Sequence, residues 1–368
     1  MIESELDLAK KHVSSSVIRK FRSSAKKAYK LALCGMFADL LHTGRFSNGP
    51  FWGDVYTMYI NLEIDPRLNN NVDMITSRLR DDLSNYYFHS LDDDSVNEII
   101  AFFRNIIKNI EDKNKRLYLV SEVQKIYDIK RVYKESQYIT LKDHHWLDFG
   151  FDGNPITATY PEFFNYIDLI NLWNDFVSKY KQYEQLIVTR DNNNEIRRLH
   201  YSLNSSSRFL VISSIIFVES YLYYLFYSIK NNNTYSNDDR VKGILNRRGY
   251  IQDTQIVEDI IFKLFEEVEN NQFIKKKYDL YEQSIELRNR LVHTSAFVDE
   301  SNNLSQLHPL IDIDLKDVIS IAQNSIDFVV KIDELLPDED KILIWWDRFD
   351  TPDFYKLEPI NTLNIYRS

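Results

Sequence analysis

One short stretch of this sequence concentrates side chains that can do chemistry on a phosphate. Residues 286–293, Glu-Leu-Arg-Asn-Arg-Leu-Val-His, place a guanidinium at Arg288, a carboxamide at Asn289 and an imidazole at His293. A guanidinium binds phosphate oxygens through a fork of donors and stabilises the charge that builds on them. An imidazole titrates near neutral pH, so it can remove a proton from a ribose 2'-hydroxyl or supply one to a leaving oxygen. These groups suffice for RNA cleavage without a metal.

The stretch lies late in a helical pattern that we expect to run from residue 273 to about 295. At 100° per residue, Asn289 and His293 lie about 40° apart, whereas Arg288 and His293 lie about 140° apart. The arginine and histidine meet on one ligand if the arginine reaches round the helix, if the helix ends before the histidine, or if a second chain faces the first. The structural alternative is that Arg288 and Arg290 are solvated and His293 interacts with the helix C-terminus.

Composition predicts a mainly α fold for the elements that must position this stretch. The 368 residues include only 8 Gly and 8 Pro but 24 Tyr and 22 Phe, a composition that favours long helices with aromatic packing. We expect an N-terminal α-helical domain over 1–135, an irregular linker over 136–161, a helical bundle over 162–336 and a tail over 337–368 that packs on the bundle.

Hydrophobic periodicity and turn residues predict the individual elements. The N-terminal region, residues 5–42, should form one or two helices, and residues 138–141 a short strand. Ser95 or Asp94 is the expected N-cap of a helix that follows them. Further helices are expected at 96–110, 161–189, 209–229, 241–248, 254–269 and 315–336.

The helix at 209–229 is long and apolar enough to cross a bilayer. It carries one charge, Glu219, near its centre, together with several tyrosines and serines, and a carboxylate at that depth is costly in a membrane. We therefore expect a central helix buried by its neighbours, in which the Glu219 carboxylate has a partner. A membrane-associated effector that uses this segment is a further alternative.

The charge distribution limits nucleic-acid binding to local contacts. The net charge of -10 opposes a globally electrostatic nucleic-acid binder. A basic run near the N-terminus can meet phosphates, although a solvated helix face is the alternative. The run comprises Lys10, Lys11, Arg19, Lys20, Arg22, Lys26, Lys27 and Lys30. Within the whole chain, the RNA-binding candidates are Lys26, Lys27, Arg247 and Arg248.

Neither a metal nor another cofactor is expected. Asp143, His144, His145 and Asp148 form the one cluster of histidines and carboxylates, but adjacent side chains do not easily point at one ion, so we expect a polar loop. Cys34, the only cysteine, excludes a disulfide framework and fits a reducing cytoplasm. The acidic start of the chain does not resemble a signal peptide.

The segment from Arg288 to His293 resembles the Arg-x4-6-His motif of the HEPN superfamily, in which a polar residue such as Asn often follows the arginine. Its place late in the penultimate long helix is similar too. The resemblance covers about residues 162–336. It implies a helical bundle that commonly dimerises and brings two motif copies into one composite cleft. Many such proteins are metal-independent ribonucleases of toxin-antitoxin, abortive-infection and other antiviral systems.

By matching position, the resemblance makes Arg288 and His293 the catalytic pair, with Asn289 and the neighbouring Arg290 in support. Glu219 corresponds to an acidic residue that some members place near the motif. Thr294 and Ser295 stand where toxins modified by a partner nucleotidyltransferase carry a tyrosine, which argues against such a partner.

The expected function is a cytoplasmic, homodimeric endoribonuclease in phage defence or a toxin-antitoxin-like stress system. Its partners would be RNA, with tRNA among the candidate substrates, and an antitoxin or regulatory protein, but no membrane. The alternative from another class is a non-catalytic helical module for RNA binding or protein interaction.

Overall fold

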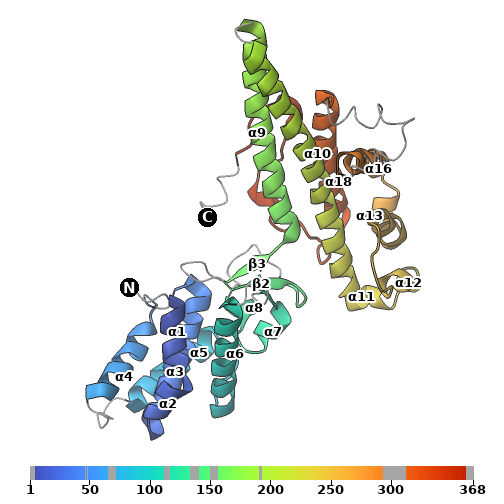
Figure 1. The fold of residues 1–368 in the computed structure, drawn as a ribbon. Helices are drawn as coiled ribbons and strands as arrows, with labels where there is room; N and C mark the ends of the chain where they lie inside the picture. The colour runs from blue at the N-terminus through green and yellow to red at the C-terminus, as the bar shows by residue number, and fades with distance from the viewer. Residues whose placement is uncertain are drawn as a thin grey trace. The chain divides into compact units, whose positions relative to one another are not determined.

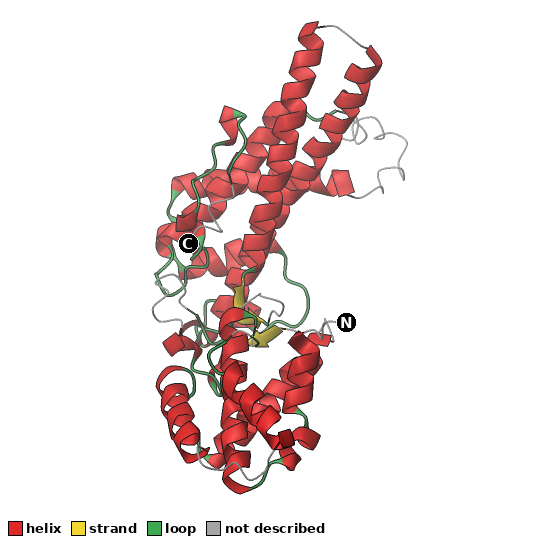
Figure 2. Ribbon diagram, turned by 90° about the vertical axis from the view of Figure 1, so that its left-hand side faces the viewer, coloured by secondary structure: helices red, strands yellow, loops and turns green. Residues whose placement is uncertain are grey.

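The computed structural model describes residues 5–45, 47, 49–64, 72–111, 117–132, 141–149, 156–189, 193–292 and 312–361. Of these residues, 75% are helical and 4% lie in strands, which confirms the mainly α fold. Figure 2 shows the strands confined to one short sheet. The chain divides into two compact units, Met1–Thr159 and Tyr160–Ser368.

Helix α3 lies within the helices of the first unit, with α2, α4, α5 and α6 as packed neighbours (Figure 1). This helix is buried along most of its length and packs against α4, α5 and α6. The helices of this unit are α1 (Glu5–Val13), α2 (Ser15–Lys20), α3 (Ser23–Thr43), α4 (Trp52–Ile64), α5 (Val72–Tyr86), α6 (Asp93–Glu111), α7 (Val120–Gln124) and α8 (Ile129–Val132).

The first region contains more helix breaks than its periodicity predicts. Residues 5–42 form three helices instead of one or two, because Ser14 ends α1 and caps α2 by accepting a hydrogen bond from the Val17 amide at 3.3 Å. Phe21 and Arg22 are extended and separate α2 from α3. The start of α6 also differs, since Asp92 accepts from the Ser95 amide at 2.7 Å and the helix begins at Asp93.

Three short antiparallel strands complete the first unit in the order β1 (Leu117–Leu119), β2 (Trp146–Asp148) and β3 (Thr157–Thr159). The strand expected at 138–141 falls almost wholly outside the described residues. Backbone bonds from Val120 to the His145 carbonyl and from Ser121 to the Asp143 carbonyl, both 2.9 Å, tie the turn before β2 to α7.

The second unit is built on α9 (Pro161–Thr189) and α10 (Asn193–Lys230), which lie side by side (Figure 1). The bounds of α9 agree with the prediction, and the predicted 209–229 helix is part of α10. Besides α9, α10 packs against α13 (Asp253–Ile256), α16 (Gln272–Val292) and α18 (Leu315–Leu335). It is thus the central helix of the unit.

Among the described helices, α10 is the one that passes a test of length and composition for a membrane span. Its most apolar window has a mean hydropathy of 1.8, and 61% of that window is buried inside the protein. The core helix of a soluble protein passes the same test, so this finding does not decide between a membrane and a core.

The remaining helices of the unit are short: α11 (Asn233–Ser236), α12 (Lys242–Leu245), α14 (Phe262–Leu264) and α15 (Glu266–Glu269). The prediction of a single amphipathic helix over 254–269 is wrong, because the segment forms several short pieces. A π-helical turn at Val257–Ile261 follows α13, and Phe265 leaves the helical conformation at φ -117°, ψ 91° before α15 begins. The π turn and this break change the direction of the segment, so it buries its apolar residues without forming one straight helix.

The tail after α18 packs on the bundle through buried aromatic residues. The Trp345 indole donates to the Glu162 carboxyl at 3.0 Å, and the Trp173 indole donates to the Glu358 carbonyl at 2.8 Å. The Phe354 ring is fully buried, 4.7 Å from the Trp173 ring. These contacts join residues far apart in the sequence and hold the tail against the first half of α9.

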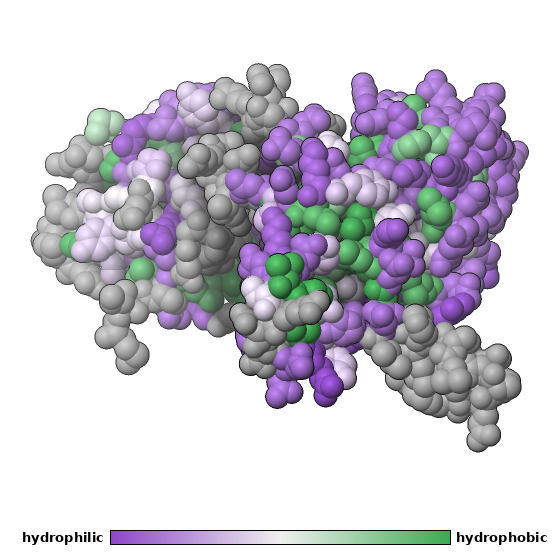
Figure 3. All heavy atoms as spheres, turned by 90° about the horizontal axis from the view of Figure 1, so that it is seen from above, coloured by the Kyte–Doolittle hydropathy of each residue, from purple (hydrophilic) through white to green (hydrophobic). Residues whose placement is uncertain are grey.

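Hydrophilic side chains cover most of the surface that Figure 3 shows for the described residues, with smaller hydrophobic areas between them. Large exposed hydrophobic residues are therefore informative where they share a face. On α10, Phe209 is 57% exposed and Ile216 is 40% exposed. They stand seven residues apart, two helical turns, and so lie on the same side of the helix.

Burial of Glu162 predicts a pH dependence of stability. Burial raises the pKa of this carboxyl from 4.5 to about 8, against the opposing effect of the Trp345 indole. The folded protein therefore binds the proton more tightly than the unfolded chain, and stability falls as pH rises from about 4.5 to about 8. Glutamine cannot ionise, so the stability of Glu162→Gln should lack this part of the pH dependence.

The measurement is the free energy of unfolding of both proteins across that pH range. Glu162→Gln should gain stability relative to the wild type as pH rises. A difference between the two proteins that does not change with pH would contradict the assignment.

Candidate functional site

Arg288 is held by Glu219, which lies in another helix. The guanidinium of Arg288 on α16 donates through Nη2 to Oε1 of Glu219 on α10. Their side chains are only 22% and 24% exposed. An ion pair this far from water is screened less than a surface pair. Glu219 thus has the partner that its place in an apolar helix required.

Opposing effects act on the pKa of the Glu219 carboxyl. Burial raises the pKa of Glu219, Arg288 acts in the opposite direction, and the nearby Asp253 adds to the rise. The Nε atom of Arg288 is buried and has no hydrogen-bond acceptor among the residues that the structure describes. A buried donor without an acceptor is unusual, since nearly all such groups are paired.

Two further polar residues complete this cluster. Tyr281 lies seven residues before Arg288, and therefore on the same face of α16, and its hydroxyl donates to the Asp253 carboxylate at the start of α13. Both Tyr281 and Asp253 are buried. Helices α10, α13 and α16 thus meet around one guanidinium and two carboxylates. Helical spacing from Arg288 could have identified Tyr281, but no sequence signal pointed to Asp253.

The other motif residues are placed differently. Asn289 and Arg290 are exposed, and Arg290 pairs with Glu286 one turn earlier on the same helix. His293 lies outside the described residues, beyond the last residue of α16, Val292. The structure therefore brings together Glu219 and Arg288, which the sequence analysis named separately, and places Asn289 away from them.

The RNA-binding candidates lie in both units. Lys27 donates to Asp93 at 2.8 Å, and Lys26 is partly buried. Arg247 makes a long contact of 3.4 Å with a glutamine of α13, and Arg248 is exposed with no acidic partner among the described side chains. The two arginines lie in the loop between α12 and α13, and α13 also carries Asp253.

An exposed aromatic residue adjoins these arginines. Tyr250 is 74% exposed, and its ring lies 6.2 Å from that of Tyr223 on α10. Tyr223 donates its hydroxyl to the Ile251 carbonyl at 2.8 Å and stands one turn after Glu219. The loop is therefore anchored beside the ion pair, and Tyr250, Arg247 and Arg248 form a strip that we call the loop strip. Sequence reasoning missed Tyr250.

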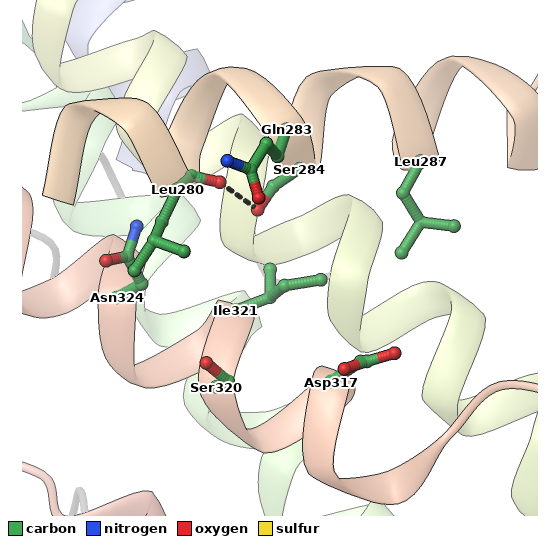
Figure 4. A pocket seen from close by; sticks show the side chains of 8 residues that line it. All are labelled: Leu280, Gln283, Ser284, Leu287, Asp317, Ser320, Ile321 and Asn324. Carbon is green, nitrogen blue, oxygen red and sulfur yellow. Dashed lines mark hydrogen bonds between the residues drawn. The ribbon is translucent and has the colours of Figure 1, made fainter. Parts of the chain in front are cut away.

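A separate groove of about 260 Å³ lies between α16 and α18 (Figure 4). The Ser284 hydroxyl donates to the Leu280 carbonyl at 2.7 Å on one wall. The lining residues are Leu280, Gln283, Ser284, Leu287, Asp317, Ser320, Ile321 and Asn324. Their only charged member is an acid, so the groove suits a small, partly apolar group and not a phosphate.

A metal centre finds no support in the described part of the chain, where no group of three or more His, Cys, Asp and Glu side chains is placed to hold an ion. In the predicted polar loop, burial lowers the pKa of His144 to about 4 and that of His145 to about 3. The Nδ1 atom of His145 accepts from the Lys142 amide at 3.3 Å.

Comparisons of this chain with protein-family models, curated proteins and solved structures found no match. Function must therefore be inferred from the site itself.

Coupling between Glu219 and Arg288 is the first test of this geometry. Removing one partner leaves the other partly buried and unpaired, so Arg288→Ala should destabilise the fold by about 1–3 kcal/mol. In a double-mutant cycle with Glu219→Gln, we expect a coupling energy of about 0.5–3 kcal/mol from denaturant unfolding. Additive effects of the two substitutions would show that the ion pair does not contribute.

Proposed function

We propose that this chain is a metal-independent endoribonuclease of the HEPN type, in which Arg288 and His293 act on the phosphodiester. The observation that supports this most directly is the partly buried ion pair between Glu219 and Arg288. It holds a guanidinium five residues before the histidine of the motif and leaves one of its donors unsatisfied. A fixed guanidinium costs little reorganisation when charge develops on a phosphate.

In the proposed reaction, His293 removes the proton of the ribose 2'-hydroxyl. The 2'-oxygen attacks the phosphorus and forms a new P–O bond, while the bond to the 5'-oxygen of the next nucleotide breaks. Arg288 binds the non-bridging oxygens. An imidazolium supplies the proton to the leaving 5'-oxygen, so the products are a 2',3'-cyclic phosphate and a 5'-hydroxyl. Asn289 and Arg290 would support the imidazole and the RNA backbone.

A homodimer would supply a composite site. Phe209 and Ile216 form an exposed apolar strip on α10, and Ile216 stands three residues from Glu219, on the adjoining part of the same face. A second copy that covers this strip would bring its own motif close to Arg288. Such an arrangement would overcome the angular separation of Arg288 and His293 within one helix.

The loop strip would guide the RNA to the site. Arg247 and Arg248 can neutralise phosphates, and the exposed Tyr250 ring can stack on an unpaired base. Tyr250 contacts Tyr223, one turn from Glu219, so a strand that stacks here would lie beside the ion pair.

The setting we propose is the cytoplasm, in a toxin-antitoxin-like or abortive-infection defence, with RNA as substrate, tRNA among the candidates, and an antitoxin or regulatory protein as partner. The alternative is a non-catalytic RNA-binding or interaction module. One observation favours it: a donor of Arg288 is already engaged by Glu219, as in a structural ion pair.

Cleavage of RNA in EDTA distinguishes these two functions. The purified protein should cleave total RNA or tRNA and leave 2',3'-cyclic phosphate ends. Arg288→Ala and His293→Ala should each lower the rate at least about 100-fold, since each removes a group that acts in the transition state.

Lys276→Ala is the matched control, because this lysine is exposed on the same α16 helix and lies three turns from Arg288. It should cleave at the wild-type rate. Equal cleavage by all four proteins would show that the nuclease activity does not come from this site.

Binding through the loop strip is tested with Tyr250→Ala. Loss of one stacked base should weaken binding of single-stranded RNA by about 1–3 kcal/mol, measured by fluorescence anisotropy in the His293→Ala background. Tyr355→Ala, which removes another exposed tyrosine of the same unit, is the control. If the two substitutions weaken binding equally, RNA does not follow the loop strip.

A further inference from the structure

A basic cleft lies in the first unit, in a different part of the chain from the Glu219–Arg288 site. It has a volume of about 330 Å³ and lies between the junction of α1 and α2 and one side of α6. Its lining residues are Lys10, Val13, Ser14, Ser15, Arg104, Ile107 and Lys108. The charged members are three cations, and the apolar floor comes from Val13 and Ile107, both buried. The N-terminal basic run contributes only Lys10, since the other two cations come from α6.

Arg104 builds the cleft by joining its two walls. Its Nε donates to the carbonyl of Val13, the last residue of α1, at 2.7 Å. Ser14 fixes the same corner, because its hydroxyl donates to the Lys11 carbonyl at 2.8 Å and accepts from the Val17 amide. The walls are therefore set before any ligand arrives, which lowers the entropic cost of binding.

Two of the three cations of the cleft lie close together. Arg104 and Lys108 are one turn apart on α6, a spacing at which like charges repel, and neither forms an ion pair with a carboxylate whose side chain the structure describes. Lys10, on α1, lies 3.8 Å from Asp7. Burial lowers the pKa of Arg104, because its guanidinium is partly removed from water. The negative charge of a bound anion would offset both the repulsion and the cost of this burial.

The chemistry of the lining selects among anions. Arg104 offers the donors not used on Val13, Lys108 offers an ammonium, and Ser15 offers an exposed side-chain hydroxyl, a combination suited to phosphate oxygens. The floor of Val13 and Ile107 favours a ligand that also carries an apolar or flat portion. The volume is at the lower end of the range for small-molecule sites. We infer that this cleft binds the phosphate of a mononucleotide-sized ligand, with the remainder of the ligand over Val13 and Ile107.

Isothermal titration calorimetry of the full chain with 5'-AMP, adenosine and inorganic phosphate tests this inference. We expect 5'-AMP to bind, adenosine not to bind, and inorganic phosphate to compete with 5'-AMP. Lys108→Gln should weaken 5'-AMP binding about tenfold, the effect of losing one hydrogen bond between charged groups. This lysine is exposed, so the substitution should not disturb folding.

Lys125→Gln is the matched control, since it removes an exposed lysine of the same unit outside the cleft. It should leave 5'-AMP binding unchanged. No binding of 5'-AMP at millimolar concentration, equal binding of adenosine, or equal loss in both variants would overturn the inference. If a short single-stranded DNA without terminal phosphates binds through Lys108 while 5'-AMP does not, the occupant is a nucleic-acid strand and the small-ligand inference is wrong. None of these outcomes depends on ribonuclease activity.

Discussion

The ion pair between Glu219 and Arg288 is the constraint on which the second unit depends. A carboxylate in the middle of an apolar helix is costly unless a cation accompanies it. Because α10 is surrounded by α9, α13, α16 and α18, that cation has to come from a packed neighbour, and α16 supplies it. The same contact sets the rotation of α16, so Arg288 and Tyr281 face α10 and α13, whereas Asn289 and Arg290 face solvent.

This rotation links packing to the proposed chemistry. In the proposed reaction, the guanidinium that Glu219 holds in place is the group that binds the phosphate, and because its Nε is buried, the substrate oxygens would meet its other donors. On a continuous helix, positions five residues apart point about 140° away from each other, so the proposal places the complementary histidine on a second copy of the chain.

The sequence predicted well those features that depend on local periodicity. The bounds of α9 and α18 follow from apolar spacing, with Pro161 at the first position of one and Asp314 capping the other. The need for a partner at Glu219 followed from the apolar stretch around it. Tyr281 could have been found from its spacing to Arg288.

Features that depend on contacts between distant segments could not be predicted. Asp253 reaches the site only because a short helix and a π turn interrupt a segment that reads as one amphipathic helix. The central strand, residues 146–148, pairs with residues 117–119 on one side and with 157–159 on the other, and none of the three has a strong pattern of its own. The basic cleft likewise joins Lys10 to Arg104, two residues separated by most of the first unit.

The most direct test of a shared ribonuclease site is complementation between two inactive variants. Arg288→Ala and His293→Ala would be purified, mixed under conditions that exchange subunits, and assayed for RNA cleavage in EDTA. The account predicts that the mixture regains about a quarter of the wild-type activity, since half of the dimers are mixed and each holds one of two complete pairs. No recovery, with subunit exchange verified by labelled chains, would contradict a site built from Arg288 of one copy and His293 of the other.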